Sequence, residues 1–182
     1  GLLEYATLYD GVISWVLDTI NILKGRSDCN LYIKPHPGEV FNSSSSLKGV
    51  LDFIYEQYPT LPRNIKIVAP ELKIRPYDLF QFIDVGLVYN GSIGLEMLLR
   101  NIPVVTTGLA AYGYLGSVSS PKTRLEYTKI LVGEIEVKIP EPREIELFAY
   151  FYFIKSLIPW TLTKRAFADR FKGYNFSSLN DL

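Results

Sequence analysis

Short apolar runs alternate with segments of helical periodicity through the first 106 residues, and this order limits the fold more than any other feature. The runs predicted to be strands are 31–34, 65–68, 84–89 and 103–106, and the segments predicted to be helices are 8–23, 47–58, 77–82 and 92–100. Alternation with short connections is typical of parallel strands joined by right-handed crossovers. We therefore expect an α/β fold in which helices flank a parallel sheet.

Glycine, proline and serine predict where several elements begin and end. Gly25 is expected to end the first helix, and Pro59 to end the second. The serine run 43–46 is expected to supply the loop and N-cap before that second helix. Further helices are predicted at 122–131 and 143–158.

Length and composition suit one large domain or a domain with an appendage. Of the 182 residues 48% are hydrophobic, which is enough for a core. We expect a nucleotide-binding domain over 1–140 and a C-terminal helical extension over 141–182. The 19 basic and 19 acidic side chains cancel and no long basic block occurs, so nucleic-acid binding is not expected.

Cysteine and histidine usage argues against disulfides and metal sites. The lone Cys29 excludes an internal disulfide and fits a reducing compartment, so the expected location is the cytoplasm. Without a CxxC or paired His and Cys, no metal site is expected. No signal peptide is visible, and no apolar run reaches the roughly 18 residues of a membrane-spanning helix.

The segment 89–96 joins a predicted strand to a predicted helix through a small polar turn. Gly91 allows close backbone approach, and Asn90 and Ser92 add polar side chains. A helix N-terminus after such a turn suits a phosphate or another anion. Glu96 lies one turn beyond Ser92 on the same face, where its carboxylate can accept hydrogen bonds from ribose hydroxyls. An ordinary turn with Ser92 as N-cap and a solvated Glu96 is the alternative.

The only histidine lies in a second loop, Lys34-Pro35-His36-Pro37-Gly38, after another predicted strand. Because the prolines restrict the backbone, His36 is held on a stiff loop, where its imidazole can donate to a phosphate oxygen. A surface histidine that only packs on this loop is the alternative. Two such loops at the carboxyl ends of strands predict a nucleotide-type ligand.

Residues after the fourth strand offer weaker candidates. The loop 108–116, with Tyr112 and Tyr114, is expected to form a wall against a base or sugar, a mobile lid, or an unstructured connection. Lys122 and Arg124 either supply positive charge to an acidic ligand or face solvent.

The quoted segments together resemble a known family. Lys34-Pro35-His36-Pro37, then Tyr89-Asn90-Gly91-Ser92-Ile93-Gly94-Leu95-Glu96, then Ile102-Pro103-Val104-Val105-Thr106-Thr107-Gly108, is similar to the capsule polysaccharide biosynthesis family, which includes bacterial Kdo transferases that use CMP-Kdo. The resemblance covers 31–114.

The resemblance implies a GT-B glycosyltransferase, of which this chain resembles the C-terminal, Rossmann-like half that binds the donor. By similarity, His36 is the catalytic residue and contacts the CMP phosphate together with Ser92. Lys34, Asn90 and Gly91 would belong to the same donor site, and Glu96 would lie near the ribose. The implied partners are a CMP-linked nucleotide sugar and a polysaccharide or glycolipid acceptor. No cofactor or metal is implied, because a CMP-sugar carries a single phosphate.

Two departures from the family pattern shape the expected activity. Relatives often have a Ser-Ser pair where this chain has Gly91-Ser92, and the acidic motif of the N-terminal half is not found before His36. We expect a fragment that binds a nucleotide but does not transfer sugar without an N-terminal GT-B domain.

Three alternatives stay open. One is a UDP-sugar epimerase-like GT-B domain. Another is a polyol-phosphate transferase-like domain, although the usual Asp-Tyr-Ser-Ser turn is missing. The third is a non-catalytic Rossmann module used for assembly or regulation.

The C-terminal helix has no charged residue over 147–154 and is rich in aromatic side chains. Such a helix normally packs inside protein or at an interface, and packing on the same or the missing domain is the favoured interpretation. Contact with the inner face of a membrane, through basic residues around and beyond the helix, is the alternative.

Overall fold

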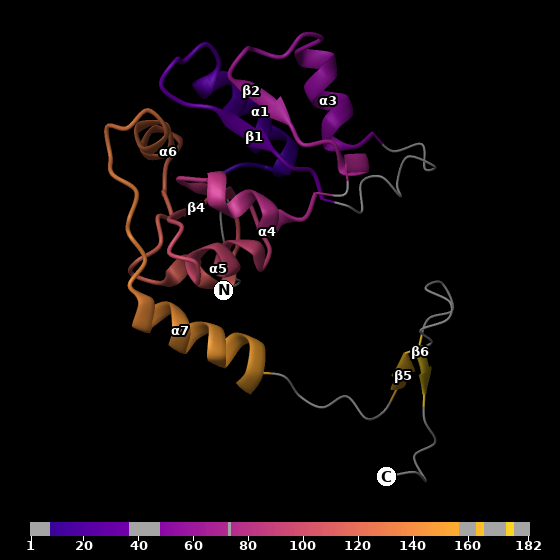
Figure 1. Ribbon diagram of the computed structural model, residues 1–182, viewed down its shortest axis with the longest axis vertical. Coiled ribbons are helices and arrows are strands. Elements are labelled where there is room, and N and C mark those ends of the chain that lie inside the picture. The colour runs from indigo at the N-terminus through magenta and orange to yellow at the C-terminus, as the bar shows by residue number, and fades with distance from the viewer. Residues whose placement is uncertain (1–7, 37–47, 73, 157–162, 166–173, 177–182) are drawn as a thin grey trace, which may run out of the picture. The chain divides into compact units, whose positions relative to one another are not determined.

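The computed structural model describes residues 8–36, 48–72, 74–156, 163–165 and 174–176. The chain divides into two compact units, Gly1–Glu146 and Leu147–Leu182. The first unit has the alternating helices and parallel strands of an α/β fold, as the sequence predicts (Figure 1).

The elements of the first unit follow the predicted order with tighter bounds. The helices are α1 (Val12–Leu23), α3 (Val50–Gln57), α4 (Pro76–Leu79), α5 (Ile93–Leu98) and α6 (Arg124–Leu131), and the strands are β1 (Leu31–Ile33), β2 (Ile65–Ile67), β3 (Gly86–Val88) and β4 (Val104–Thr106). Short 3₁₀ helices lie at Pro70–Leu72, Phe80–Phe82 and Ala111–Tyr114. Helix α7 (Pro142–Tyr150) begins in the first unit and ends in the second.

The four strands form two parallel pairs. Strand β1 pairs with β2, with Leu31 opposite Ile65, and β3 pairs with β4, with Gly86 opposite Val104. An isolated parallel bridge joins Val105 to Ser119. Among the described residues no strand hydrogen bonds link the two pairs, so a single four-stranded sheet stays a prediction.

Helix α1 connects the two strand pairs through the core. Its buried residues Val16 and Ile20 pack with Ile54 of α3 and Ile65 of β2. The side chains of Trp15 and Ile22, on the same helix, also pack against a second cluster around Val105, Tyr127 and Ile130. One helix therefore contributes to the cores beside both pairs.

The ends of the first two helices show one confirmed and one wrong prediction. Gly25 follows α1 with a φ of 77°, a left-handed conformation that favours glycine. The N-cap of α3 is Gly49 rather than a serine, and its N–H donates to the Asp52 carboxylate at 2.8 Å. The Asp52 carboxylate in the first turn thus satisfies the N–H of the N-cap residue, and the run 43–46 lies outside the described residues.

In the second unit the predicted C-terminal helix is confirmed as far as Lys155. Helix α7 passes into a π-helical turn, Phe151–Lys155, and strands β5 (Thr163–Arg165) and β6 (Tyr174–Phe176) pair antiparallel. Over the described part of the chain, no helix combines the length and apolar character needed to cross a membrane.

Candidate functional site

The segments that follow β3 and β4 are packed against each other. Val88 and Thr106 are opposite one another at the carboxyl ends of these strands, so the chain leaves both strands at one edge. A Cβ atom on Gly108 would lie 2.1 Å from the Tyr89 carbonyl oxygen and 2.8 Å from Asn90 Oδ1. Only a glycine fits here without movement of the backbone. Among the described residues, a Cβ atom on Gly91 would have no neighbour within 4 Å, so the close packing in this region is at Gly108 and not at Gly91.

Tyr112 fixes the next part of the loop onto the turn before α5. The ring is buried, with 2% of the side chain exposed, and its hydroxyl donates to the Gly91 carbonyl oxygen at 3.0 Å. A Cβ atom on Gly94 would lie 2.0 Å from the Tyr112 Oη, so the ring requires the glycine in α5. Gly91 itself has a φ of 110°, which side-chain-bearing residues rarely adopt.

The loop 108–116 is thus ordered by contacts at both ends. Glu144 accepts hydrogen bonds from the backbone N–H groups of Gly116 at 3.0 Å and Ser117 at 3.1 Å. The Ser117 hydroxyl also donates to this carboxylate, and these bonds hold the pKa of Glu144 below its ordinary value. Tyr114 stays exposed. These contacts show a structured loop rather than an unstructured connection, and a role as a wall or as a lid stays a prediction.

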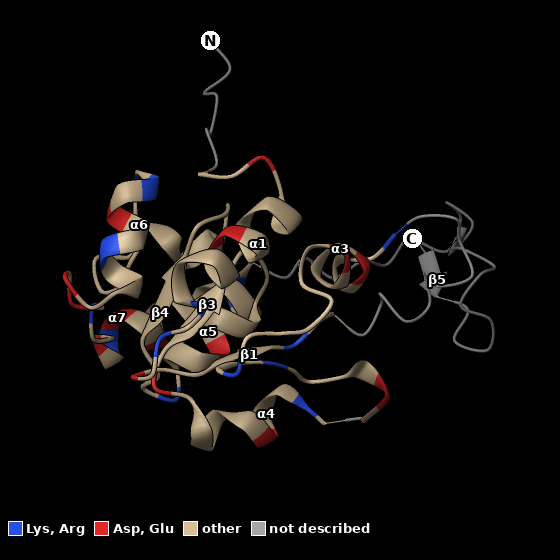
Figure 2. Ribbon diagram, turned by 90° about the horizontal axis from the view of Figure 1, so that it is seen from above, with Lys and Arg blue, Asp and Glu red and all other residues tan. Residues whose placement is uncertain are grey.

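Ser92, Glu96 and Tyr77 form a polar cluster beside this turn. The Ser92 hydroxyl donates to Glu96 Oε1 at 3.0 Å, and the Tyr77 hydroxyl donates to Glu96 Oε2. This hydrogen bond to the carboxylate raises the pKa of Tyr77 above its ordinary value. Tyr77 lies in helix α4 and Glu96 in α5, and Figure 2 shows acidic residues on both helices.

The structure differs from the alternative interpretation of this cluster, an ordinary turn with a solvated Glu96, in two details. Ser92 has helical dihedral angles and makes no side-chain capping bond, because its hydroxyl is used by Glu96. Glu96 is half-buried and bonded rather than simply solvated. Helix α5 has only six residues, so side-chain and backbone donors, more than its dipole, would carry anion binding.

Lys34 and His36 lie in the other strand pair, just after the carboxyl end of β1. Pro35 is buried, Lys34 is half-buried and His36 is exposed, so the imidazole is on a loop anchored by a buried proline. Pro37 and Gly38 are outside the described residues. That His36 and Ser92 share one ligand stays a prediction.

Aromatic side chains contact Tyr89, the residue that follows β3. The Trp15 ring lies 5.6 Å from the Tyr89 ring, and the Tyr89 hydroxyl donates to the Tyr9 carbonyl oxygen at 3.2 Å. Trp15 Nε1 in turn donates to the hydroxyl of the buried Tyr127 at 2.9 Å. Since the Thr19 hydroxyl donates to the Trp15 carbonyl oxygen, the Tyr127 hydroxyl is the donor to Thr19 Oγ1 at 2.8 Å.

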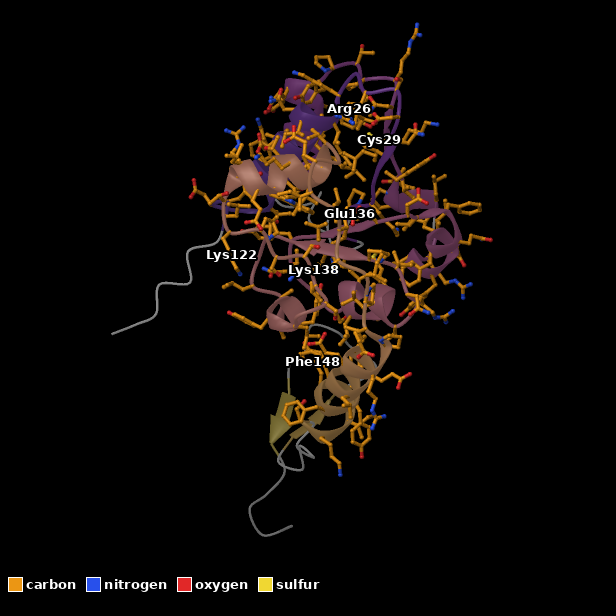
Figure 3. The ribbon with its side chains drawn as sticks, turned by 90° about the vertical axis from the view of Figure 1, so that its left-hand side faces the viewer. Arg26, Cys29, Lys122, Glu136, Lys138 and Phe148 are labelled. Atoms are coloured by element: carbon orange, nitrogen blue, oxygen red, sulfur yellow. The ribbon has the colours of Figure 1, made fainter. Side chains whose placement is uncertain are left out.

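Arg124 forms an ion pair with Asp18, so its charge is already paired within the protein. Its Nε donates to Asp18 Oδ2 at 2.7 Å, and a second nitrogen donates to Oδ1. Tyr9 donates to the same carboxylate at 2.7 Å. The Arg124 hydrogen bond holds the pKa of Asp18 below its ordinary value. Lys122, the other basic candidate, is exposed (Figure 3).

Two residues of this site are not among the sequence candidates. Tyr77 is 19 positions from Glu96, so no local periodicity indicates their hydrogen bond. The Thr107 hydroxyl, next to Gly108, is buried and has no hydrogen-bond partner within the described chain. Across the same residues, no group of three or more His, Cys, Asp or Glu side chains is arranged to hold a metal ion.

Comparison with known proteins adds no relative: no family model, no curated protein and no solved structure matches this chain.

Proposed function

We propose that this chain is the donor-binding half of a GT-B glycosyltransferase and that it holds a CMP-linked sugar. In this proposal the two parallel pairs belong to one Rossmann-like arrangement, with the ligand at the carboxyl ends of β1 and β3. Ligands of open α/β folds bind outside the carboxyl ends of strands. The sugar would be added to a bacterial capsule or another surface polysaccharide.

One observation carries the proposal: the loops after β3 and β4 form a single, tightly packed element with polar side chains beside it. Gly108 lies against Asn90, and Tyr112 is bonded to Gly91, which fixes the backbone that leads into Ser92. A preformed turn loses little conformational freedom when it binds a ligand. This geometry supports a binding role more than that of a simple connection.

The phosphate would be held by Ser92 and His36. An imidazole N–H is a suitable donor to a phosphate oxygen, and so is the Ser92 hydroxyl once its proton turns from Glu96 Oε1 to the ligand. As the glycosidic bond to CMP breaks, negative charge grows on the departing phosphate, and donors placed at that oxygen stabilise the transition state. Lys34 would add positive charge beside them. His36 is the residue to which we assign this catalytic role.

The ribose would bind at Glu96. Each carboxylate oxygen accepts one hydrogen bond from Ser92 or Tyr77, and each has a second lone pair for a ribose hydroxyl. The Tyr77 hydrogen bond keeps the carboxylate oriented when the Ser92 hydroxyl turns to the phosphate. The acceptor and the catalytic base would come from another domain of the enzyme.

Thermal denaturation with added nucleotides tests this proposal. CMP should raise the melting temperature of the chain, whereas UDP and GDP should not, because only a ligand of the folded state stabilises it. His36→Ala and Ser92→Ala should each remove the CMP effect while leaving the melting temperature without CMP unchanged. Lys34→Ala should reduce the rise in melting temperature that CMP causes. Lys122→Ala, the matched change of an exposed lysine, should leave this rise unchanged.

Other results would replace the proposal. Stabilisation by UDP in preference to CMP would favour the epimerase-like alternative. No response to any nucleotide would favour a non-catalytic module. Unfolding of His36→Ala would assign the histidine a structural role.

A further inference from the structure

The second unit has an exposed apolar stripe on α7 and the π-helical turn that follows. The stripe consists of Leu147, Tyr150, Phe151 and Ile154, which recur at i, i+3, i+4 and i+7. Each of these side chains is between 51% and 61% exposed. The stripe is exposed in the described residues, and packing of this segment on the same or a missing domain stays a prediction.

The rest of the segment is ordered by its own aromatic contacts. The Phe148 and Tyr152 rings are stacked at 5.9 Å with an interplanar angle of 17°, and Figure 3 labels Phe148 on this helix. Tyr152 also meets Phe153 edge to face at 5.1 Å. The Ser156 N–H donates to the Phe151 carbonyl oxygen at 2.8 Å, which closes the π-helical turn.

The two units of the chain differ in net charge. Residues 1–146 contain 14 basic and 17 acidic side chains. Residues 147–182 contain only two acidic side chains, Asp169 and Asp181, and five basic ones, namely Lys155, Lys164, Arg165, Arg170 and Lys172. The same 36 residues hold 10 of the 25 aromatic side chains in the chain. A net charge of +3 on an aromatic segment complements a negatively charged surface.

The combination fits the interface of a lipid bilayer. Tyrosine rings with a polar tip prefer the headgroup level, and lysine places its stem along apolar surface while its ammonium stays in water. Here Lys155 is exposed, and its Nζ lies 5.7 Å from the centre of the Tyr150 ring in the stripe. The nine residues of α7 and the five of the π-helical turn rise about 20 Å, too little to cross a hydrocarbon core of about 30 Å. A helix of this kind lies in the plane of the interface.

We propose that the stripe Leu147, Tyr150, Phe151 and Ile154 inserts into the headgroup region of an anionic membrane, with Lys155 at the lipid phosphates. This proposal does not depend on the nucleotide site. It commits to a lipid surface and not to a second protein domain, because the positive charge of the segment matches anionic headgroups.

Co-sedimentation of the full 182-residue chain with vesicles tests the proposal. The chain should bind vesicles of phosphatidylcholine and phosphatidylglycerol in equal parts, and bind phosphatidylcholine alone much more weakly. Raising the salt concentration should weaken binding, since screening shortens the reach of the basic residues. Phe151→Ser should lower the affinity about tenfold, and Lys155→Gln about fivefold.

Phe82→Ser is the matched control, because Phe82 is 72% exposed in the 3₁₀ helix Phe80–Phe82 of the first unit. It should bind anionic vesicles as the unmodified chain does. Circular dichroism should show that Phe151→Ser and Lys155→Gln retain the fold. The proposal would be overturned if the chain did not bind anionic vesicles or did not prefer anionic lipid. It would also be overturned if Phe151→Ser bound anionic vesicles as well as the unmodified chain does. Sedimentation of the chain as a dimer that Phe151→Ser converts to a monomer would overturn it too, because the stripe would then be a protein interface.

Discussion

Gly108→Ala tests whether the loops after β3 and β4 act as one element. The added Cβ would lie 2.1 Å from the Tyr89 carbonyl oxygen, more than 1 Å short of a normal contact of about 3.5 Å. The opposing atom belongs to the backbone at the end of β3, so no side-chain rotation relieves the overlap. Overpacking of this kind costs about 1–3 kcal/mol, and a backbone clash lies at the upper end. We expect the free energy of unfolding to fall by about 3 kcal/mol.

The same substitution should weaken nucleotide binding. If the two loops separate by about 1 Å, Ser92 and the backbone of Asn90 lose their alignment with a bound phosphate, and hydrogen bonds weaken steeply with distance and angle. The affinity for CMP should fall by about tenfold or more. Urea denaturation followed by circular dichroism measures the first effect, and calorimetric titration with CMP measures the second.

Gly116→Ala is the control in the same loop. Among the described residues its Cβ would have one neighbour within 4 Å, Glu144 Oε1 at an ordinary 3.6 Å, and the N–H that donates to this carboxylate remains. Its unfolding free energy should stay within about 0.5 kcal/mol of the unmodified chain. Equal stability of Gly108→Ala and Gly116→Ala would refute the close packing of the two loops.

Three further substitutions test the surroundings of the site. Asp18→Asn should lower the unfolding free energy by about 1–2 kcal/mol at pH 7. Because Arg124 depresses the pKa of Asp18, the stability that the carboxylate contributes is present above about pH 4 and lost as the pH falls. The difference in unfolding free energy between the unmodified chain and Asp18→Asn should therefore shrink in acid titrations. Tyr127→Phe should cost about 2 kcal/mol at pH 7 by removing the partner of Trp15 Nε1. Burial raises the pKa of Tyr127, so the stability that its hydroxyl contributes is complete below about pH 10 and lost as the pH rises. Denaturation at higher pH should therefore show a smaller difference in unfolding free energy between the unmodified chain and Tyr127→Phe. Thr107→Val should raise the unfolding free energy by about 1 kcal/mol, since it removes a buried hydroxyl without a partner in the described residues, and a loss would mean that this hydroxyl is bonded.

The sequence predicts the elements of this fold well because their signals are local. The apolar run of β2 at Ile65–Ile67 and the helical spacing of α1 at Val12–Leu23 each depend on neighbouring residues. Which strands bond to each other depends on contacts between distant segments. Periodicity alone therefore predicts parallel strands, but not their grouping into two separate pairs.

The same distinction explains what is missed at the site. The Tyr77–Glu96 and Tyr112–Gly91 hydrogen bonds join residues 19 and 21 positions apart, and the Arg124–Asp18 pair joins residues 106 apart. One signal does exist for the Tyr112 contact. Glycine inside a helix costs about 1 kcal/mol relative to alanine, so Gly94 indicates close packing by another group. The sequence does not show which group that is.

A double-mutant cycle on CMP affinity tests the central claim that His36 and Ser92 hold one phosphate. Calorimetric titration would compare the unmodified chain, His36→Ala, Ser92→Ala and the double variant. We predict that the two losses are not additive and that the coupling free energy exceeds about 0.5 kcal/mol, as expected for two donors on one group. Losses that add within about 0.3 kcal/mol, or an unmodified chain that does not bind CMP, would contradict the claim.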